Sequence, residues 1–265
     1  MIEIGLVGPG RLGRTIAAAL PTDDYHLGPI VSSNLVSARK AVRELRRGHA
    51  SGSLSALAAC DAVLLTVPEA LLPGIARELL NQINLANKVV IYATGENDRA
   101  THLALRDEGA HPVNLFPLTI LNRPAEDLAG VCCALAGSPV GLRFARRLAA
   151  ACGAVPAVVD TESVPRIAAA TALLVEPLTA LAHICGGILG SSGLSRRRTA
   201  DVLMSLTRTA IEDHVRGAKG GRADPTPAAA HADLRKRLGA LRDREAKAGR
   251  ETLENISTYA AKAGL

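Results

Sequence analysis

A short apolar run followed at once by three spaced glycines is the feature that most constrains this fold. Residues 4–13 read IGLVGPGRLG, which places glycines in the pattern G-x-G-x-x-G. The first glycine permits a tight turn, the second has no Cβ to hold off a phosphate, and the third lets the following helix pack closely on the strand. That helix directs free N–H groups and the positive end of its dipole at the ligand. We therefore predict dinucleotide contacts, rather than a plain glycine-rich loop, at Gly8, Pro9, Gly10, Arg11, Leu12 and Gly13.

The first 160 residues alternate short apolar runs with amphipathic helical patterns. This alternation is typical of an α/β fold, in which helices cover both faces of a doubly wound parallel sheet. The carboxyl ends of the strands in such a sheet are where ligands bind. We predict strands at Ile2–Val7, His26–Ser32, Ala62–Val67, Lys88–Tyr92 and Val113–Phe116, with later additions at Val131–Ala136 and Val155–Val159.

After Thr161 the sequence has helical patterns without strands. Ser163–Leu189 is nearly all Ala, Leu, Ile, Val and Thr, which predicts a helix buried around most of its circumference, and a more amphipathic helix follows at Ser195–Arg216. Gly217–Pro227 has the composition of a loop, and two charged helices are predicted beyond it. We predict a nucleotide-binding domain at 1–160 and a helical domain for substrate binding or dimerisation at 161–265.

Composition limits the classes of partner. Hydrophobic residues make up 48% of the 265 residues, which is enough for two cores. No uninterrupted apolar run is expected to reach the length of a membrane span, and the first residue opens into a predicted strand. We therefore expect a cytoplasmic protein without a signal peptide or a membrane partner. The net charge of +6 suits an anionic ligand, but only 2% of residues are aromatic and basic residues are partly interleaved with acids, so we expect no nucleic-acid partner.

The five cysteines have neither C-x-x-C nor Cys/His spacing. They lie among small and apolar residues, which indicates buried reduced thiols rather than disulfides or metal ligands. We predict no metal site. No Ser/His/Asp arrangement and no Walker-type lysine is apparent either.

The end of the second predicted strand indicates which nucleotide binds. NAD-binding domains usually place an Asp or Glu there to accept hydrogen bonds from the ribose hydroxyls, whereas this strand ends in Ser32, Ser33 and Asn34. Arg39 and Lys40 follow, and a guanidinium favours a 2′-phosphate that an acid would repel. We therefore favour NADP (NADPH). The alternatives are that the two basic residues form a solvated helix face, or that a deazaflavin is the partner.

Two further strand ends are expected to contact the nucleotide. Val67 and Pro68 close one strand, and Thr94 closes the next. Asn114 and Thr119 lie at the end of a later strand, where each could contact the nicotinamide or the substrate, or merely cap a turn. We include Asn114 and Thr119 among the catalytic candidates.

At this point the chain resembles small Rossmann-like reductases with a helical C-terminal domain, including pyrroline-5-carboxylate reductase, imine reductases and deazaflavin-dependent NADP oxidoreductases. The resemblance rests on the motif from Gly8 to Gly13, the run Cys60–Pro68, Thr94-Gly95, Phe116-Pro117-Leu118 and the helix that begins at Arg166. It is strongest for the subgroup that pairs a Rossmann-like domain with the domain of unknown function 2520, and it covers essentially the whole chain. The resemblance implies an NADP-dependent reductase.

The chain departs from that subgroup at two positions. Phe116 stands where the subgroup has a histidine before Pro-Leu, and Val175-Glu176 stands near a Ser-Asn pair in the long helix. If those polar residues serve chemistry in the relatives, the reaction or the substrate of this protein should differ.

Glu176 is the acid of the long apolar helix, and an unpaired buried carboxylate is costly. Pro177 follows it and removes one helical N–H. His183 lies seven positions on, hence on the same helical face. We predict that Glu176 is a proton donor or an anchor for a cationic imine, and that His183 lines the same cleft. The alternatives are a structural ion pair or a dimer-interface contact for Glu176, and a hydrogen-bonded helix histidine for His183.

These features predict an NADPH-dependent reductase of a C=N or C=O bond in a small-molecule substrate, with its site between the two domains of a homodimer. One alternative is a dehydrogenase that works in the oxidative direction. The other is a non-catalytic module that senses a nucleotide or binds a partner, which fits the missing histidine at Phe116 and the absence of lysine from the long helix.

Overall fold

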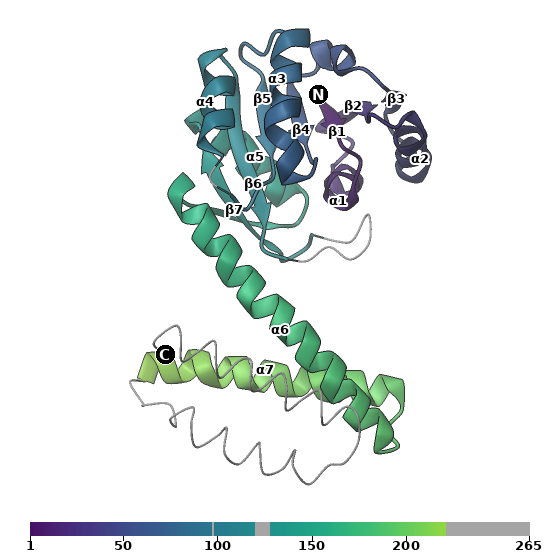
Figure 1. Ribbon diagram of the computed structural model, residues 1–265, viewed down its shortest axis with the longest axis vertical. Coiled ribbons are helices and arrows are strands. Elements are labelled where there is room, and N and C mark those ends of the chain that lie inside the picture. Colours follow the sequence, from purple (N-terminus) through teal and green to yellow (C-terminus); the bar gives the residue numbers. More distant parts are fainter. Residues whose placement is uncertain (97, 120–127, 221–265) are drawn as a thin grey trace. The chain divides into compact units, whose positions relative to one another are not determined.

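The computed structural model describes residues 1–96, 98–119 and 128–220 (Figure 1). The charged helices predicted near the C-terminus lie outside these ranges. The chain divides into two compact units, Met1–Leu173 and Leu174–Leu265, and each is described by itself. The domain boundary predicted after residue 160 stays a prediction.

The first unit is built on one eight-stranded sheet, which confirms the predicted α/β fold. Its order is β3-β2-β1-β4-β5-β6-β7-β8. The strands are β1 (Ile2–Val7), β2 (Tyr25–Val31), β3 (His49–Ser51), β4 (Ala62–Leu65), β5 (Val89–Tyr92), β6 (His111–Pro117), β7 (Cys132–Gly137) and β8 (Val155–Val158). Neighbouring strands run parallel except for β6 and β7, which are antiparallel. The sheet is therefore mixed at one side rather than wholly parallel as predicted.

Helices follow the strands and begin at residues that suit a helix start. The first unit contains α1 (Arg11–Ala19), α2 (Leu35–Leu45), α3 (Leu72–Gln82), α4 (Arg99–Asp107) and α5 (Pro139–Ala151), with 3-10 turns η1 (Leu54–Ala59), η2 (Glu69–Leu71) and η3 (Thr161–Ser163). Asn34, Asp98 and Ser138 cap α2, α4 and α5 by accepting a backbone N–H in the first turn. Such caps satisfy N–H groups that have no partner within the helix.

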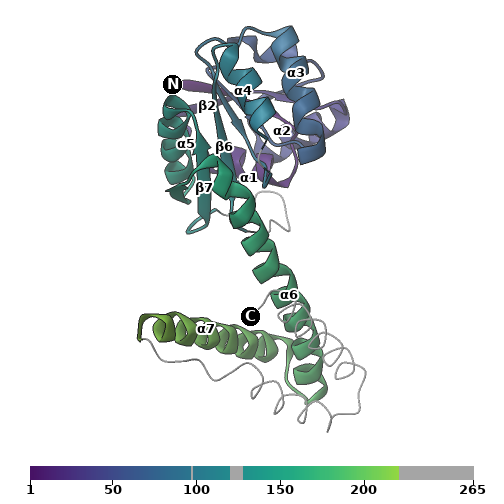
Figure 2. The same cartoon turned by 60° about the vertical axis from the view of Figure 1, so that its left-hand side comes forward.

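Alternation along the strands sends side chains into two separate cores. On β4, Leu64 belongs to the core that α1, α2 and α5 cover, whereas Val63 and Leu65 belong to the core that α3 and α4 cover. Successive side chains of a strand point to opposite faces, so helices are needed on both sides of the sheet (Figure 2). This layering leaves the carboxyl ends of the parallel strands as the edge where turns and helix N-termini meet.

Two long helices follow, α6 (Val164–Ser191) and α7 (Arg196–Gly220). The helix α7 continues past Gly217, where a loop was predicted to begin. The stretch Thr161–Ser191 has 31 residues and a mean hydropathy of 1.7 in its most apolar window, none of which is buried. By length and composition it could therefore cross a membrane, contrary to the expectation that no apolar run here would reach that length. The sequence predicted that this helix is buried around most of its circumference, but the described residues do not bury it.

Candidate functional site

The turn between β1 and α1 requires glycine at its first position. Gly8 has a φ of +80°, and a Cβ added there would lie 2.8 Å from Val67 Cγ1 and 2.9 Å from the carbonyl oxygen of Thr66. The turn closes when Gly10 N donates to Gly8 O at 2.7 Å. Both the positive φ and the nearby segment Thr66–Val67 therefore exclude a side chain at Gly8.

The other two glycines of the motif have opposite surroundings. A Cβ at Gly13 would overlap Thr66 Oγ1 and lie 2.9 Å from Gly8 O, so this glycine lets α1 pack against β1 and β4. A Cβ at Gly10 would meet nothing nearer than Thr66 O at 3.8 Å, and the backbone there is extended. Gly10 therefore faces open space that the fold leaves beside the N-terminus of α1.

That helix N-terminus is suited to an anion. Gly10 is the N-cap and provides no side-chain hydrogen bond, and the first turn contains no acidic residue. Arg11 is exposed, and Pro9 and Leu12 are half-buried. Free N–H groups and the helix dipole favour a phosphate at such an end. The open space at Gly10 and the uncapped turn together fit the pyrophosphate of a dinucleotide.

Thr66 is a residue of this turn that sequence reasoning missed. Its Oγ1 donates to Gly8 O at 2.7 Å, and its backbone N donates to Val7 O at 2.9 Å. The Thr66 side chain, which follows β4, thus holds the glycine turn that follows β1. A threonine after an apolar strand carries no signal of this role, because its partner lies 58 residues away.

The turn after β2 has no acid, as predicted from the sequence. Ser32 Oγ accepts from Asn34 N at 3.2 Å, and Asn34 Oδ1 accepts from Val36 N at 3.0 Å, so these two side chains shape the turn and cap α2. Ser33 and Arg39 are exposed and make no side-chain hydrogen bond or ion pair to another described residue. The Lys40 ammonium lies 3.8 Å from Glu44 Oε1. The side chains of Ser33 and Arg39 are therefore available to contact a ligand, whereas Lys40 lies near Glu44.

The ends of β5 and β6 are joined by a reciprocal pair of hydrogen bonds. Thr94 N donates to Asn114 Oδ1 at 3.2 Å, and Asn114 Nδ2 donates to Thr94 O at 2.9 Å. Both residues are nearly inaccessible, at 2% and 3% exposure. The amide of Asn114 is thus engaged with the backbone of Thr94. Thr119 is half-buried in the bend after β6.

Glu69 is a second residue that sequence reasoning missed. It follows Val67, which is half-buried, and Pro68, which is exposed and caps η2. Its Oε1 accepts from Thr94 Oγ1 at 2.9 Å and from Gly95 N. The signal in the sequence that could have identified Glu69 is an acidic residue shortly after the end of a predicted strand. The described part of the chain thus brings Gly8, Gly10, Val67 and Thr94 to one edge of the sheet, together with Glu69.

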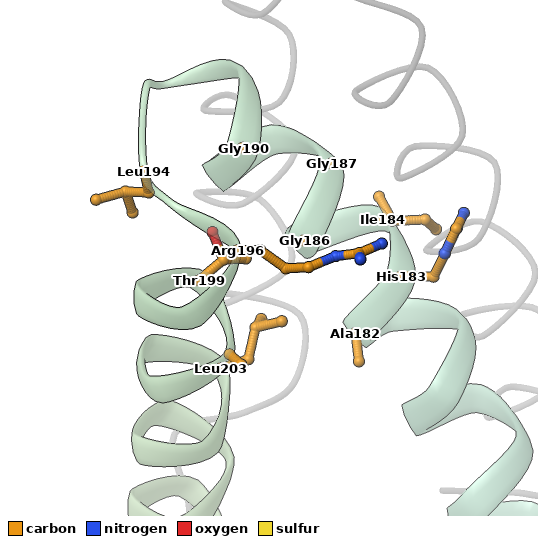
Figure 3. Close-up of a pocket in the computed structure, with 11 residues that line it drawn as sticks. Ala182, His183, Ile184, Gly186, Gly187, Gly190, Leu194, Arg196, Thr199 and Leu203 are labelled. Atoms are coloured by element: carbon orange, nitrogen blue, oxygen red, sulfur yellow. The ribbon is translucent and has the colours of Figure 1, made fainter.

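The helix α6 contains the other catalytic candidates. Glu176 precedes Pro177 within α6, and its side chain lies outside the described part of the chain, so its predicted role stays a prediction. His183 is exposed and lines a cavity of about 870 Å³ within the second unit, together with Arg196 and Thr199 of α7 (Figure 3). His183 therefore lies at the border of a cavity that α6 and α7 form within the second unit.

The cysteines take no part in these contacts. Burial raises the pKa of the Cys60, Cys133 and Cys152 thiols to about 11, so they stay protonated and unreactive near neutral pH. Cys132 is half-buried and Cys185 is exposed. Within the described ranges, no group of three His, Cys, Asp or Glu residues could hold a metal ion.

Comparison with known proteins agrees with this architecture. Residues 1–117 match the family described as a Rossmann-like domain. No curated protein matches the chain. An imine reductase from Pseudomonas sp. is 15% identical with a TM-score of 0.76, over 99% of this chain and 94% of that one. A reductive aminase from Aspergillus terreus in complex with NADPH and ethyl levulinate is 15% identical with a TM-score of 0.70, over 100% and 95%.

An arogenate dehydrogenase from Synechocystis is also 15% identical, with a TM-score of 0.56 over 98% of this chain and 90% of that one. At these identities the likeness establishes the fold. The chain therefore contains a Rossmann-like domain followed by a helical remainder, as the sequence predicted.

Proposed function

We propose that the first unit binds NADP(H) and that the protein is an NADPH-dependent reductase of a C=N or C=O bond in a small metabolite. The observation that carries the proposal is the open space at Gly10, beside an uncapped helix N-terminus and a β2 end without an acid. A phosphate-binding turn and a positively charged neighbour at Arg39 together favour a phosphorylated dinucleotide. The names of the imine reductase and the NADPH-bound reductive aminase support the same class of reaction.

Each part of the site has a role in this proposal. The N–H groups at the start of α1 hold the pyrophosphate, and Ser33 with Arg39 holds the 2′-phosphate. The turn at Thr94 and the segment after β4 border the place for the nicotinamide half, because ligands of open α/β sheets lie outside the carboxyl ends of the strands. NADPH, when bound, supplies a hydride. The protein holds it in place and orients an acceptor, which is the main requirement of such a site.

Two observations favour rival functions. The arogenate dehydrogenase shares the fold and its name indicates oxidation, so the direction of hydride transfer is part of the proposal. The side chains of Asn114 and Thr94 are both engaged in hydrogen bonds that hold the strand ends, which leaves fewer polar groups to contact a substrate and fits a nucleotide sensor.

Turnover separates these functions. The purified protein would be incubated with NADPH and a panel of cyclic imines and 2-ketoacids, and with NADP⁺ and the corresponding amines and hydroxyacids. The proposal expects oxidation of NADPH with at least one imine or ketone. Reaction only in the reverse direction would establish a dehydrogenase. Tight binding of NADPH without turnover of any acceptor would favour the sensor.

We expect Arg39→Ala to weaken NADPH about tenfold or more and to leave NADH nearly unchanged. A charge-assisted phosphate contact contributes roughly 1.5–3 kcal/mol. NADH lacks the 2′-phosphate, so it does not make this contact and should not be affected by its removal. Titration of both nucleotides by nicotinamide fluorescence measures the two affinities. Arg43 is the matched control, since it is another exposed arginine of α2. Equal losses for both nucleotides would contradict the assignment.

We also propose a homodimer whose interface includes α6. Leu173 and Leu174 are more than half exposed on this helix, and a cavity of about 490 Å³ in the second unit is lined by apolar side chains such as Leu178 and Ile188. Large apolar surfaces are seldom left in water, and two-fold pairing is the usual way to cover them. Light scattering should give a dimer at micromolar concentration. A monomer, or a chain that enters solution only with detergent, would contradict this.

A further inference from the structure

The carboxylate of Glu69 ties together two turns at the edge where the dinucleotide is proposed to bind. Glu69 begins η2 after β4, and its partners Thr94 and Gly95 form the turn after β5. One oxygen, Oε1, accepts from both the Thr94 hydroxyl and the Gly95 N–H. Hydrogen bonds to an ionised acceptor are stronger than those between neutral groups. The carboxylate after β4 therefore helps to hold the turn after β5 in place.

The same turn is held from two other sides. Asn114 on β6 makes its reciprocal pair of hydrogen bonds with the backbone of Thr94. A Cβ added at Gly95 would lie 2.9 Å from Ala168 Cβ and 3.4 Å from Phe116 Cε2, so the start of α6 and the Phe116 ring leave little room beside the turn. All of these residues belong to the first unit. Together with Glu69, these residues therefore contact the turn from several elements of the fold.

Loss of the Glu69 side chain should destabilise the fold less than loss of the Asn114 side chain. Asn114 is buried, so the backbone groups that it satisfies would otherwise stay unpaired inside the protein. Glu69 is exposed, and the N–H of Gly95 lies in an exposed contact where water can replace the carboxylate. Loss of the acid should therefore cost less stability than loss of Asn114. What the acid provides is a fixed geometry, which binding sites require of the residues that support them.

We propose that Glu69 is a positioning residue for the nicotinamide half of a bound NADP(H), which it serves by holding the Thr94–Gly95 turn at a set distance from the segment after β4. This inference rests on the proposed function. The two turns border the carboxyl ends of neighbouring strands, where ligands of open α/β sheets lie. The glycine turn and Arg39 hold the other half of the nucleotide through separate contacts, so the two halves should respond differently to a change at Glu69.

The test compares the affinity for NADPH with that for 2′-phospho-ADP-ribose, which lacks the nicotinamide. Glu69→Ala should weaken NADPH about tenfold, because the turn beside the nicotinamide half loses both hydrogen bonds to the carboxylate, and leave the truncated nucleotide within about twofold of wild type. Glu69→Gln keeps an oxygen acceptor in the same place and should retain most of the affinity. Glu78→Ala is the matched control, since Glu78 is an exposed acid on α3 of the same unit. Calorimetry gives all of these affinities without a substrate.

Each outcome bears on one of the two proposals. If Glu69→Ala weakens both nucleotides equally, or neither, Glu69 is not a positioning residue for the nicotinamide half, although the proposed function would stand. If wild-type protein binds neither nucleotide, the proposed function fails and the inference fails with it. Should Glu69→Ala not fold, Thr94→Val removes the hydroxyl that donates to Glu69 and also accepts from Glu96 N, and it should likewise weaken NADPH more than the truncated nucleotide.

Discussion

Gly10→Ala is expected to lower the affinity for NADPH about 100-fold while leaving the melting temperature unchanged. The added methyl group meets no protein atom nearer than 3.8 Å, and the backbone at Gly10 is extended, a conformation that alanine adopts freely. The methyl group would instead occupy the space proposed for the pyrophosphate. It would hold the ligand away from two or more N–H groups, each charge-assisted bond contributing roughly 1.5–3 kcal/mol. Titration with NADPH and thermal unfolding without ligand measure the two quantities.

Gly13→Ala provides the contrast within the same motif. Its methyl group would overlap Thr66 Oγ1 and press on Gly8 O, so the strain falls on the packing of α1 against the sheet. Overpacking of this kind costs roughly 1–3 kcal/mol, and we expect the melting temperature to fall. If Gly10→Ala lowered the melting temperature as Gly13→Ala does, or if it bound NADPH normally, the space at Gly10 would not be the phosphate site.

The parts of the site that the sequence predicted are those whose physical requirements are local. Within ten residues, the motif contains a strand, a turn that needs a positive φ at Gly8, and a helix start without a cap. The missing acid after β2 is likewise visible in the sequence, because the position follows directly from the strand. The two-faced layering also follows from a local rule, since neighbouring side chains of a strand must be covered on both faces.

The parts that were missed depend on partners far away in the chain. Thr66 contacts Gly8, and Glu69 contacts Thr94 across 25 residues, so neither role leaves a local pattern. The direction of β7 was missed for a similar reason, because apolar alternation is the same in parallel and antiparallel strands. The strand β3 has only three residues and pairs with β2 alone, too short a run to give a periodic signal.

We expect Asn114→Ala to lower the free energy of unfolding by about 2–4 kcal/mol. The variant leaves the N–H and the carbonyl of Thr94 without partners at a position that is 2% exposed, and each buried unpaired group costs roughly 1–3 kcal/mol. Denaturant titration measures the loss. Thr119→Ala is the matched control: Thr119 is the other catalytic candidate beside β6, is half-buried and makes no side-chain hydrogen bond to a described residue, so its change should stay within about 0.5 kcal/mol.

The same variant decides between the two roles open to Asn114. If the amide hydrogen-bonds the substrate or the reacting atoms, Asn114→Ala should lose turnover at saturating substrate while its unfolding free energy stays near that of wild type. If the amide holds the strand ends together, stability should fall first, and part of the NADPH affinity should fall with it, because the Thr94 turn loses one of the supports that fix it. The reciprocal hydrogen bonds favour the second result, since they fix the amide against the Thr94 backbone at a position that is only 3% exposed and so offers little access to a ligand.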